Sequence, residues 1–508
     1  MIKAIDNLLN RVTMYRLVAY YLAGLIAIAV LLSFAHILPY DPFALLFTTG
    51  FLIAVSWLTN ALFARVFRVP ANVESTYITA LILALIVNPL SGYPDLLVIG
   101  WIGVLAMASK YILAIGGKHV FNPAAIAVTI TAVFLSQTAS WWIASGPMLP
   151  FVLIGGVLLV RKLRRGGMVF SFFVSALITS VLLSALAGSD VAMTVREMLT
   201  ASPLLFFGFV IITEPLTMPP TQSLQYGYGA LTGFLFSPQV HFGSFYITPE
   251  LAMVLGNVFS YLVSPKQKLV LTLRDATRIH LGADLWDFVF TPSRRLSYAP
   301  GQYMEWTLGH ADPDSRGNRR YFTLASSPTE NNLRVGIKFP SNASTFKQSM
   351  LAMDQNSSIV AAQLAGDFTL PSDRSQKIVM IAGGIGITPF RSMIKYLVDM
   401  HERRDVVLFY ANRTIEDIVY RDVFDAARQK LGIKTIYTLT DKTRAPKYWN
   451  GALGHITPEM IRKEAPDYAN CLFYLSGPNS MVTSFEETLV RMGVSERQIK
   501  KDFFPGFA

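Results

Sequence analysis

A glycine-rich turn in the second half of the chain has the residue types that can hold a phosphate. Gly383-Gly-Ile-Gly386 follows an apolar strand pattern, Ile378–Ala382, and precedes an amphipathic helix pattern that extends to about residue 400. Glycine at such a turn lets backbone N–H groups approach a pyrophosphate, because no Cβ stands in the way. The spacing differs from the usual dinucleotide fingerprint, so a tight strand-to-helix turn without a ligand is the alternative.

Four further motifs occur in order around this turn. Pro300-Gly-Gln-Tyr303, Arg320–Ser326 and Gly366–Leu370 precede it, and Ser476-Gly-Pro478 follows it. The five motifs in this order resemble those of the ferredoxin–NADP reductase superfamily over residues 266–508. The resemblance implies an FAD-binding barrel, a nicotinamide-binding domain and hydride transfer from NAD(P)H to FAD.

The resemblance also implies roles for individual side chains. Arg320 would neutralise the FAD pyrophosphate, and Ser344 and Thr345 would open a helix directed at the same group. Phe322 would lie against the isoalloxazine ring, and Thr323 would hydrogen-bond flavin N5. The other FAD and nicotinamide contacts predicted here are Tyr321, Ser326, Lys338, Phe346, Gly366, Phe368, Gly383, Gly384, Gly386, Ile387, Thr388, Pro389, Asn412, Arg413, Gly477, Pro478 and Met481.

Two positions depart from the pattern of the superfamily. Phe322 stands where tyrosine is frequent, so a ribose hydrogen bond is missing while stacking remains. Ser476 stands where cysteine is frequent, and its hydroxyl can still line the nicotinamide site. We group Ser476 with Thr323 and Phe322 as catalytic residues. The one cysteine, Cys471, lies in an apolar strand pattern and is expected to be buried and not catalytic.

Few residues are available for other redox centres. A single cysteine excludes an iron–sulfur cluster ligated by this chain's thiolates alone. Paired haems, as in ferric reductases and NADPH oxidases, need histidines on facing helices. Only three histidines precede residue 265, each near the end of an apolar stretch; the seven are His36, His119, His241, His280, His310, His401 and His455. We therefore predict no haem, no iron–sulfur cluster and no metal site.

The elements that position these motifs change character near residue 370. Residues 266–370 alternate apolar and polar side chains in short stretches such as Leu269–Leu273 and Gly301–Trp306, which predicts a small antiparallel β-barrel. Residues 371–508 alternate strand and helix patterns, which predicts an α/β doubly wound parallel sheet. Its further expected elements are the strands Val406–Tyr410, Thr435–Leu439 and Cys471–Leu475 and a helix at 416–430.

The first 264 residues have a different composition. They hold 12 of the 44 Lys and Arg and 8 of the 33 Asp and Glu, which indicates an α-helical polytopic membrane domain. The net charge of +11 could suggest a nucleic-acid partner, but no basic helix or aromatic-interleaved basic stripe occurs, so none is predicted. Surplus Lys and Arg suit cytoplasmic loops of a membrane protein instead.

Ten apolar stretches are candidates for membrane-spanning helices, since a bilayer core of about 30 Å needs roughly 20 apolar residues. Five have full length, at 17–38, 43–63, 96–114, 168–188 and 248–264, and five are shorter, at 77–88, 122–135, 148–160, 203–213 and 226–240. If the N-terminus is cytoplasmic, outside loops receive only Arg196. Inside segments receive Lys3, Arg11, Arg16, Arg65, Arg68, Lys118, Arg161, Lys162, Arg164 and Arg165. The positive-inside rule then places residue 265 onward in the cytoplasm.

The short stretches are bounded by proline and polar residues, which predicts broken helices. Asn88-Pro89 ends the third stretch and Glu214-Pro215 ends the eighth. An inverted repeat of two five-helix halves would explain the similarity of these two stretch ends. The alternative is that proline is common near helix ends. Four polar residues lie where lipid would penalise them, which favours a bound cofactor over simple helix capping: Asn122, Thr213, Glu214 and Thr217. Helix N-termini at these breaks would suit a phosphate.

Three of these stretches resemble a known membrane family. Gly116–Ala125, Ile212–Thr217 and Ser75–Pro89 are similar to hallmark stretches of the B subunit of sodium-translocating NADH:quinone oxidoreductase and the D subunit of the Rnf complex. The resemblance covers roughly residues 15–264. Members hold flavins in the membrane, one of them FMN esterified to a threonine in a Gly-Ala-Thr context. The nearest stretch here, Thr200-Ala-Ser-Pro, lacks the glycine, so we expect noncovalent FMN or riboflavin.

These observations predict a membrane-bound NAD(P)H oxidoreductase with domains at 1–264, 265–370 and 371–508. Hydride would pass from NAD(P)H to FAD in the cytoplasm, and electrons would continue to a membrane flavin and across the membrane to a quinone or an extracytoplasmic flavoprotein. One alternative is a redox-driven sodium or proton pump that uses Glu74 and Glu214. Another is an NAD(P)H:quinone reductase with the membrane half as its anchor. The expected location is the bacterial inner (cell) membrane, with lipid around the first domain and both termini cytoplasmic.

Overall fold

The chain folds into two compact units. The computed structural model places Met1–Gln267 in the first and Lys268–Ala508 in the second. Within them the structure describes Ile5, Leu9 and residues 12–67, 73–90, 92–115, 118–243, 245–263, 269–272, 278–282, 284–292, 295–310, 313–314, 317–340, 343–354 and 357–502. Several residues used in the sequence analysis lie outside this set: Lys3, Arg11, Arg68, Gly116, Gly117, Leu273 and the side chain of Lys118.

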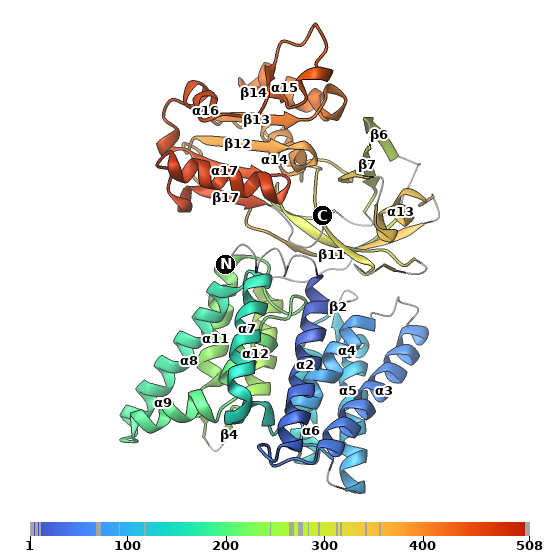
Figure 1. The fold of residues 1–508 in the computed structure, drawn as a ribbon, viewed down its shortest axis with the longest axis vertical. Coiled ribbons are helices and arrows are strands. Elements are labelled where there is room, and N and C mark those ends of the chain that lie inside the picture. Colours follow the sequence, from blue (N-terminus) through green and yellow to red (C-terminus); the bar gives the residue numbers. More distant parts are fainter. Residues whose placement is uncertain are drawn as a thin grey trace. The chain divides into compact units, whose positions relative to one another are not determined.

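The first unit is a bundle of helices with two short hairpins (Figure 1). Its first half consists of α2 (Met14–Phe34), α3 (Pro42–Val66), α4 (Val73–Ile86), α5 (Tyr93–Ile112), the hairpin strands β1 (Ala114–Ile115) and β2 (Lys118–His119), and α6 (Pro123–Leu135). Its second half consists of α7 (Leu149–Leu163), α8 (Gly166–Leu186), α9 (Val191–Thr200), α10 (Leu204–Phe206) continued by the π-helix η3 (Phe207–Ile211), α11 (Gln222–Phe236), the hairpin strands β3 (His241–Phe242) and β4 (Phe245–Tyr246), and α12 (Pro249–Val263).

The two halves repeat one order of elements. Each has two helices, then a helical segment followed by irregular chain, another helix, a two-stranded hairpin and a last helix. Corresponding helices also make corresponding contacts: α3 packs on α5 as α8 packs on α11, and α5 packs on α6 as α11 packs on α12. The last helices of the two halves, α6 and α12, pack on each other.

Helix α11 packs directly on the backbone of α8. A Cβ at Gly229 would lie 2.4 Å from the carbonyl oxygen of Met168, and a Cβ at Gly233 would lie 2.4 Å from that of Phe172. Between them, the Ser175 hydroxyl donates to the carbonyl oxygen of Ala230 at 2.7 Å. Small residues let helix backbones approach closely inside membranes, and these two positions exclude any side chain.

Helix lengths match the predicted stretches only in part. Five segments of the described chain are long and apolar enough to cross a membrane: Met14–Phe34, Pro42–Val66, Asp95–Ile112, Gly146–Leu163 and Gly166–Leu186. A sixth span would join Val191–Thr200 to Leu204–Ile211, which are bent by 59°. Stretch 148–160 was predicted to be short but belongs to an 18-residue segment, because the turn at 146–148 continues into α7. Stretch 248–264 was predicted to be full-length, but α12 has 15 residues.

The outside of the bundle is apolar, whereas polar side chains lie in its interior. Large apolar side chains of α2, α3 and α8 are more than half exposed, among them Leu31, Phe43, Phe170 and Leu186. In contrast, Asn257 and Ser260 are fully buried. Soluble proteins rarely expose large contiguous apolar patches. The long apolar helices and this distribution are compatible with a membrane protein.

The second unit begins with two antiparallel sheets, in agreement with the predicted barrel (Figure 1). Their strands are β5 (Leu269–Thr272), β6 (Arg278–Gly282), β7 (Leu285–Phe290), β8 (Tyr303–Thr307), β9 (Arg319–Thr323), β10 (Leu333–Lys338) and β11 (Ser358–Ala365), and the helix α13 (Thr345–Leu351) lies between β10 and β11 in the chain. The sheet orders are β10-β7-β6 and β5-β11-β8-β9. Trp306, Phe288 and Phe346 are fully buried in the shared core.

A six-stranded parallel sheet follows, in the order β15-β14-β13-β12-β16-β17. Its elements are β12 (Ile378–Gly383), α14 (Thr388–Asp399), β13 (Val406–Asn412), α15 (Arg421–Leu431), β14 (Lys434–Leu439), β15 (Ala452–Leu453), α16 (Pro458–Glu464), β16 (Leu472–Ser476), α17 (Asn479–Arg491) and β17 (Ile499–Asp502). Helices α14 and α15 contribute to the core on one face, and α16 and α17 contribute to the core on the other. The predicted doubly wound sheet is therefore confirmed. The helix predicted at 416–430 begins only at Arg421, because Thr414 and Asp417 form a capping box around a short 3-10 turn.

Candidate functional site

The glycine-rich turn lies at the point in the parallel sheet where the order of the strands reverses. Strand β12 pairs with β13 on one side and with β16 on the other, and ligands of such sheets bind at the carboxyl ends of the strands at this point. A Cβ at Gly386 would lie 2.4 Å from the carbonyl oxygen of Ser476. Gly384 has a φ of +53°. The structure thus brings the Gly383–Gly386 turn directly against the end of β16.

Some residues around this turn lie at the junction between the turn and the end of β16, and others support the start of α14. A Cβ at Gly383 would lie 2.3 Å from the sulfur of Met481, and Pro478 precedes the first residue of α17. Ile387 is fully buried, and the Thr388 hydroxyl donates to the carbonyl oxygen of Ile385 at 3.2 Å. Pro389 occupies the first turn of α14, where its missing N–H has no cost.

The hydroxyl of Thr323, the last residue of β9, points toward the same junction. It donates to Asp502 Oδ2 at 3.2 Å, and the Ser476 hydroxyl also hydrogen-bonds this carboxyl group. Burial raises the pKa of Asp502 to about 7, and the two hydroxyls offset part of that shift. Strand β17 places Asp502 beside Ser476 in register. Two predicted catalytic residues, Thr323 and Ser476, therefore meet at a carboxyl group.

Sequence reasoning missed Asp502. The sequence Ile499–Asp502 is short and polar, so it shows no strand pattern, and the role of Asp502 depends on pairing with β16. The signal that could have found it is an acidic residue at the end of a sixth strand of a parallel sheet.

Arg320, the predicted pyrophosphate ligand, lies in β9. Its guanidinium is 4% exposed, is 3.7 Å from Asp314 and lies over the ring of Phe346 at 5.0 Å. Ser344 accepts from the backbone N–H of Lys347 at 3.3 Å, so the predicted helix cap is confirmed. The Thr345 hydroxyl accepts from the backbone N–H of Asp314 at 3.0 Å. Arg320 and the start of α13 are thus brought together through Asp314.

Other predicted contacts have structural partners of their own. The Tyr321 hydroxyl donates to Glu305 at 2.8 Å, and Ser326 Oγ accepts from Tyr298 at 3.0 Å. Lys338 lies 3.5 Å from a carboxyl oxygen of Asp417.

Packing and backbone conformation also fix the aromatic and glycine residues that were predicted to contact FAD. The rings of Phe322 and Phe346 are 6.1 Å apart, and Phe368 packs edge-on against Tyr474. Gly366 has a φ of +116°, which favours glycine.

At the predicted adenosine end, β13 ends in Asn412, whose side chain is buried. Arg413 follows and is 73% exposed, with its Nε 3.8 Å from Asp441 Oδ2. Asp441 comes directly after β14 and the turn residue Thr440. The carboxyl edge of two neighbouring strands thus presents an arginine and an aspartate side by side.

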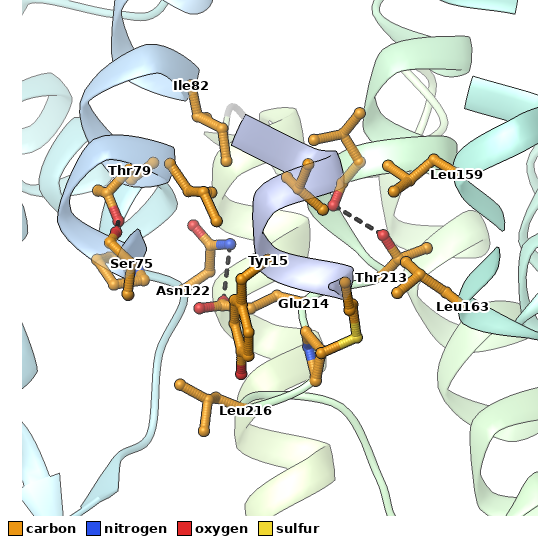
Figure 2. Close-up of a pocket in the computed structure, with 17 residues that line it drawn as sticks. Tyr15, Ser75, Thr79, Ile82, Asn122, Leu159, Leu163, Thr213, Glu214 and Leu216 are labelled. Atoms are coloured by element: carbon orange, nitrogen blue, oxygen red, sulfur yellow. Dashed lines mark hydrogen bonds between the residues drawn. The ribbon is translucent and has the colours of Figure 1, made fainter. Parts of the chain in front are cut away.

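In the first unit, the predicted polar residues converge on Glu214 (Figure 2). Asn122 donates from Nδ2 to Glu214 Oε2 at 2.9 Å, and Thr217 donates to the same oxygen at 3.1 Å. Asn122 also caps α6, because its Oδ1 accepts from the backbone N–H of Ala125 at 3.0 Å. Thr213 follows the π-helix η3 and instead donates back to the carbonyl oxygen of Phe209 in that helix at 3.0 Å.

Three further residues of this network were not predicted. His119 Nε2 lies 3.5 Å from Glu214 Oε1, and Asn257 Oδ1 accepts from the backbone N–H of Asn122 at 2.7 Å. Asn257 in turn donates to the Tyr228 hydroxyl at 3.3 Å. The signal for Asn257 was an amide in the middle of an apolar stretch, which membrane helices tolerate only with a partner.

A pocket with about 640 Å³ of empty space, a figure that includes open solvent, lies beside this network. It is lined by α2, α4 and the start of α6 from the first half, and by α7 and the chain around Thr213 from the second half: Met14, Tyr15, Val18, Ser75, Ile78, Thr79, Ile82, Asn122, Pro123, Ala124, Leu159, Leu163, Val210, Thr213, Glu214, Pro215 and Leu216. No Lys or Arg is among these described lining residues. Glu214 is the carboxyl side chain that lies against the start of α6, through its hydrogen bond with Asn122.

In comparison with known proteins, residues 380–487 match one family model. They match the oxidoreductase NAD-binding domain. The chain is 23% identical over 231 residues to a flavohemoprotein of Oceanobacillus iheyensis, covering 44% of this chain and 55% of that protein. It is 33% identical over 132 residues to NADH-cytochrome b5 reductase 1 of Meyerozyma guilliermondii, covering 25% and 45%.

Among solved structures, the FAD/NAD-binding domain of nitric oxide dioxygenase from Vibrio cholerae O1 biovar El Tor aligns with a TM-score of 0.40 at 19% identity, covering 46% of this chain and 97% of that one. The chain spans about half the length of the first curated relatives it matches. The matched domain and relatives show that the C-terminal part of the chain carries an NAD(P)H-dependent flavin oxidoreductase module, similar to reductases of the cytochrome b5 reductase and flavohemoprotein type.

Proposed function

We propose that this chain is a membrane-bound oxidoreductase that takes hydride from NAD(P)H onto FAD and passes electrons through its first unit to a quinone or an extracytoplasmic flavoprotein. The observation that carries the proposal is the meeting of Thr323, Ser476 and Asp502 at the carboxyl edge of the parallel sheet. These groups come from the barrel, from β16 and from β17, and they converge where a flavin and a nicotinamide would meet.

The side chains present fit the FAD that the module implies. Arg320 supplies a buried positive charge for the pyrophosphate, and the Phe322 ring supplies a stacking surface. The turn Gly383–Gly386 leads into α14, and N–H groups at the start of a helix suit the pyrophosphate of a dinucleotide. Thr323 presents a hydroxyl, and Asp502 can hold or release a proton beside it near neutral pH. When bound, FAD supplies acceptance of a hydride and release of single electrons.

We propose NADH rather than NADPH as the preferred donor. Asp441 lies beside Arg413 at the edge where the adenosine ribose would bind. A carboxylate there suits a ribose hydroxyl and repels a 2′-phosphate, and it neutralises the arginine that would otherwise attract one. Several relatives are named NADH-cytochrome b5 reductases.

For the first unit we propose an inverted repeat of the sodium-translocating NADH:quinone oxidoreductase and Rnf type, with a noncovalent flavin in the pocket beside Glu214. The repeated order of elements supports the repeat. The carboxylate of Glu214, with no lysine or arginine among the described lining residues, disfavours the phosphate of FMN and favours riboflavin. The bacterial cell membrane, with both termini cytoplasmic, remains the proposed location. The absence of haem stays a prediction, because several relatives are named flavohemoproteins.

A redox-driven ion pump is the second candidate function, and one buried group favours it. Glu250, in the first turn of α12, is 2% exposed and accepts from Trp141 Nε1 at 3.2 Å. Ionisable groups inside membrane helices commonly mark ion paths. Glu74, the other acid considered for pumping, instead pairs with Arg16 at 3.3 Å. The test measures turnover in sealed vesicles. The pump is favoured if turnover changes with sodium or with a proton uncoupler and if this change is lost in Glu250→Gln.

Electron transfer across the membrane is tested with inside-out vesicles. NADH added outside should reduce an impermeant acceptor trapped in the lumen. If only quinone in the membrane is reduced, the first unit is an anchor with a quinone site and the transmembrane proposal is wrong.

A further inference from the structure

Helix α14 connects the nicotinamide side of the second unit to the flavin side through one buried arginine. The helix begins at Thr388, directly after the Gly383–Gly386 turn, and Arg391 is its fourth residue. The Arg391 side chain is 5% exposed. Its Nη1 donates to the carbonyl oxygen of Ala325 at 2.9 Å, and that residue lies two positions after Thr323.

The same guanidinium is held in place from its other sides. Nη1 and Nη2 both bind the carboxylate of Glu330, Nη2 at 2.9 Å, and the group lies over the ring of Tyr420 at 5.4 Å. Glu330 also accepts from the backbone N–H of Ser327 at 2.7 Å. Burial by itself would raise the pKa of Glu330, but the hydrogen bond and charge of Arg391 hold that pKa below its ordinary value. The pair is therefore ionised, and its position is fixed by both partners.

The neighbouring residue of α14 makes a parallel contact. Ser392 donates to the carbonyl oxygen of Ser326 at 2.6 Å. Two consecutive side chains of α14 thus bind two consecutive carbonyl groups of the chain that leaves β9. A Cβ at Gly336 would lie 2.6 Å from the Tyr420 hydroxyl and 2.8 Å from Thr388 Cγ2, so the barrel and the start of α14 approach closely.

A buried ion pair is weak support for stability, because desolvation offsets most of the attraction. What a bidentate pair adds is a fixed direction and distance. Hydride transfer depends steeply on such distances, and a misplacement of about 1 Å can cost roughly 100-fold in rate.

We infer that Arg391 is a positioning residue for hydride transfer: it sets the distance between the strand that ends in Thr323 and the turn that would hold the nicotinamide, without touching either cofactor. The inference rests on the proposed function of the module. Lysine cannot replace the arginine, since it keeps the charge but lacks the planar fork that binds Glu330 and Ala325 together.

The test is Arg391→Lys in the full-length protein, with flavin reduction followed by stopped flow. We expect FAD per chain and the KM for NADH to stay within about twofold of wild type, while the rate constant for flavin reduction falls about tenfold or more. The long-wavelength absorbance of the nicotinamide–flavin complex should weaken in parallel, since it reports ring overlap and not folding.

Arg404→Lys is the matched control. Arg404 is similarly buried, with 6% of its side chain exposed, pairs with Glu402 at 2.6 Å and donates to the carbonyl oxygen of Pro371 at 2.7 Å. This variant should keep the wild-type rate of flavin reduction. If Arg391→Lys loses FAD, Ser392→Ala replaces it, with an expected fall of about threefold or more for the loss of one neutral hydrogen bond.

Three outcomes would overturn the inference: an unchanged rate in Arg391→Lys, an equal loss in Arg404→Lys, or, where Arg391→Lys loses FAD, an unchanged rate in Ser392→Ala. Failure of the proposed function is a different result, because the wild-type flavin would then not be reduced by NADH or NADPH.

Discussion

The hydroxyl of Thr323 donates a hydrogen bond of 3.2 Å to the carboxyl group of Asp502, a residue 179 positions later in the chain. The bond joins the last residue of barrel strand β9 to the last strand of the parallel sheet. It gives the proposed hydride-transfer site a titratable group beside the hydroxyl expected to face flavin N5.

The pH dependence of flavin reduction should report this carboxyl group. Because the pKa of Asp502 is raised to about 7, its charge changes near neutral pH. Stopped-flow reduction by NADH should therefore show an inflection near that pH, and Asp502→Asn should remove it. An inflection that persists in Asp502→Asn belongs to another group.

The stability of the second unit should also depend on Asp502. Its folded pKa of about 7 lies above that of an exposed aspartate, about 3.9, so the folded state binds the proton more tightly. This contribution is fully present below pH 4 and is lost as the pH rises through 7, with a size on the order of a few kcal/mol. Denaturant unfolding at several pH values should show a shallower loss across this range in Asp502→Asn than in wild type.

Thr323 and Arg320 should have separable effects on the flavin. Thr323→Ala should lower the rate of hydride transfer more than the FAD content, because its proposed partner is flavin N5. Arg320→Ala should chiefly strip FAD, since it removes a charged hydrogen bond worth about 1.5–3 kcal/mol. Equal FAD loss in both variants, with equal rates per bound flavin, would show that these roles are assigned wrongly.

Gly386→Ala should loosen the junction between the glycine-rich turn and β16. The added Cβ would lie 2.4 Å from the carbonyl oxygen of Ser476, so the backbone must shift. We expect a loss of about 1–3 kcal/mol in unfolding free energy and a higher KM for NADH. Gly309→Ala is the control, because a Cβ there would meet nothing within 4 Å. If the two variants behave alike, the close approach is not what the turn requires.

The full-length protein should release about two flavins per chain on acid denaturation, one FAD and one from the first unit, which we expect to be riboflavin. Asn122→Ala should lower the second flavin and leave FAD unchanged, because Asn122 both caps α6 and holds Glu214. Chromatography of the extract gives both numbers. One flavin per chain in the wild type would contradict the membrane site.

The parts of this fold set by local patterns were predictable, and those set by distant pairing were not. The alternation around Gly383–Gly386 predicted strand, turn and helix, because glycine, apolar runs and amphipathic periodicity act locally. The two-residue strand β15 and the polar strand β17 have no such pattern and form only against neighbours already in the sheet. Asp502 was missed for the same reason.

In the first unit, the prediction that polar residues at membrane depth serve one site was useful but incomplete. Asn122, Glu214 and Thr217 do meet, and each lies near an end of an apolar stretch. Asn257 joins them through the packing of α6 against α12, and His119 joins them from the hairpin strand β2; a single sequence reveals neither contact. The expected phosphate preference stays a prediction. The position of Glu214 beside Asn122 at the start of α6 could not be read from spacing.

The close approach of α8 and α11 makes the two halves of the first unit unequal in stiffness. At Gly229 and Gly233 backbone meets backbone, so this pair cannot slide without a clash and should move as one rigid body. In the other half, Gly100 and Gly103 of α5 meet only side chains of α3, which can change rotamer. The pocket beside Glu214 is lined by both halves. We therefore expect that the motion that opens this pocket to a ligand occurs mainly in the first half.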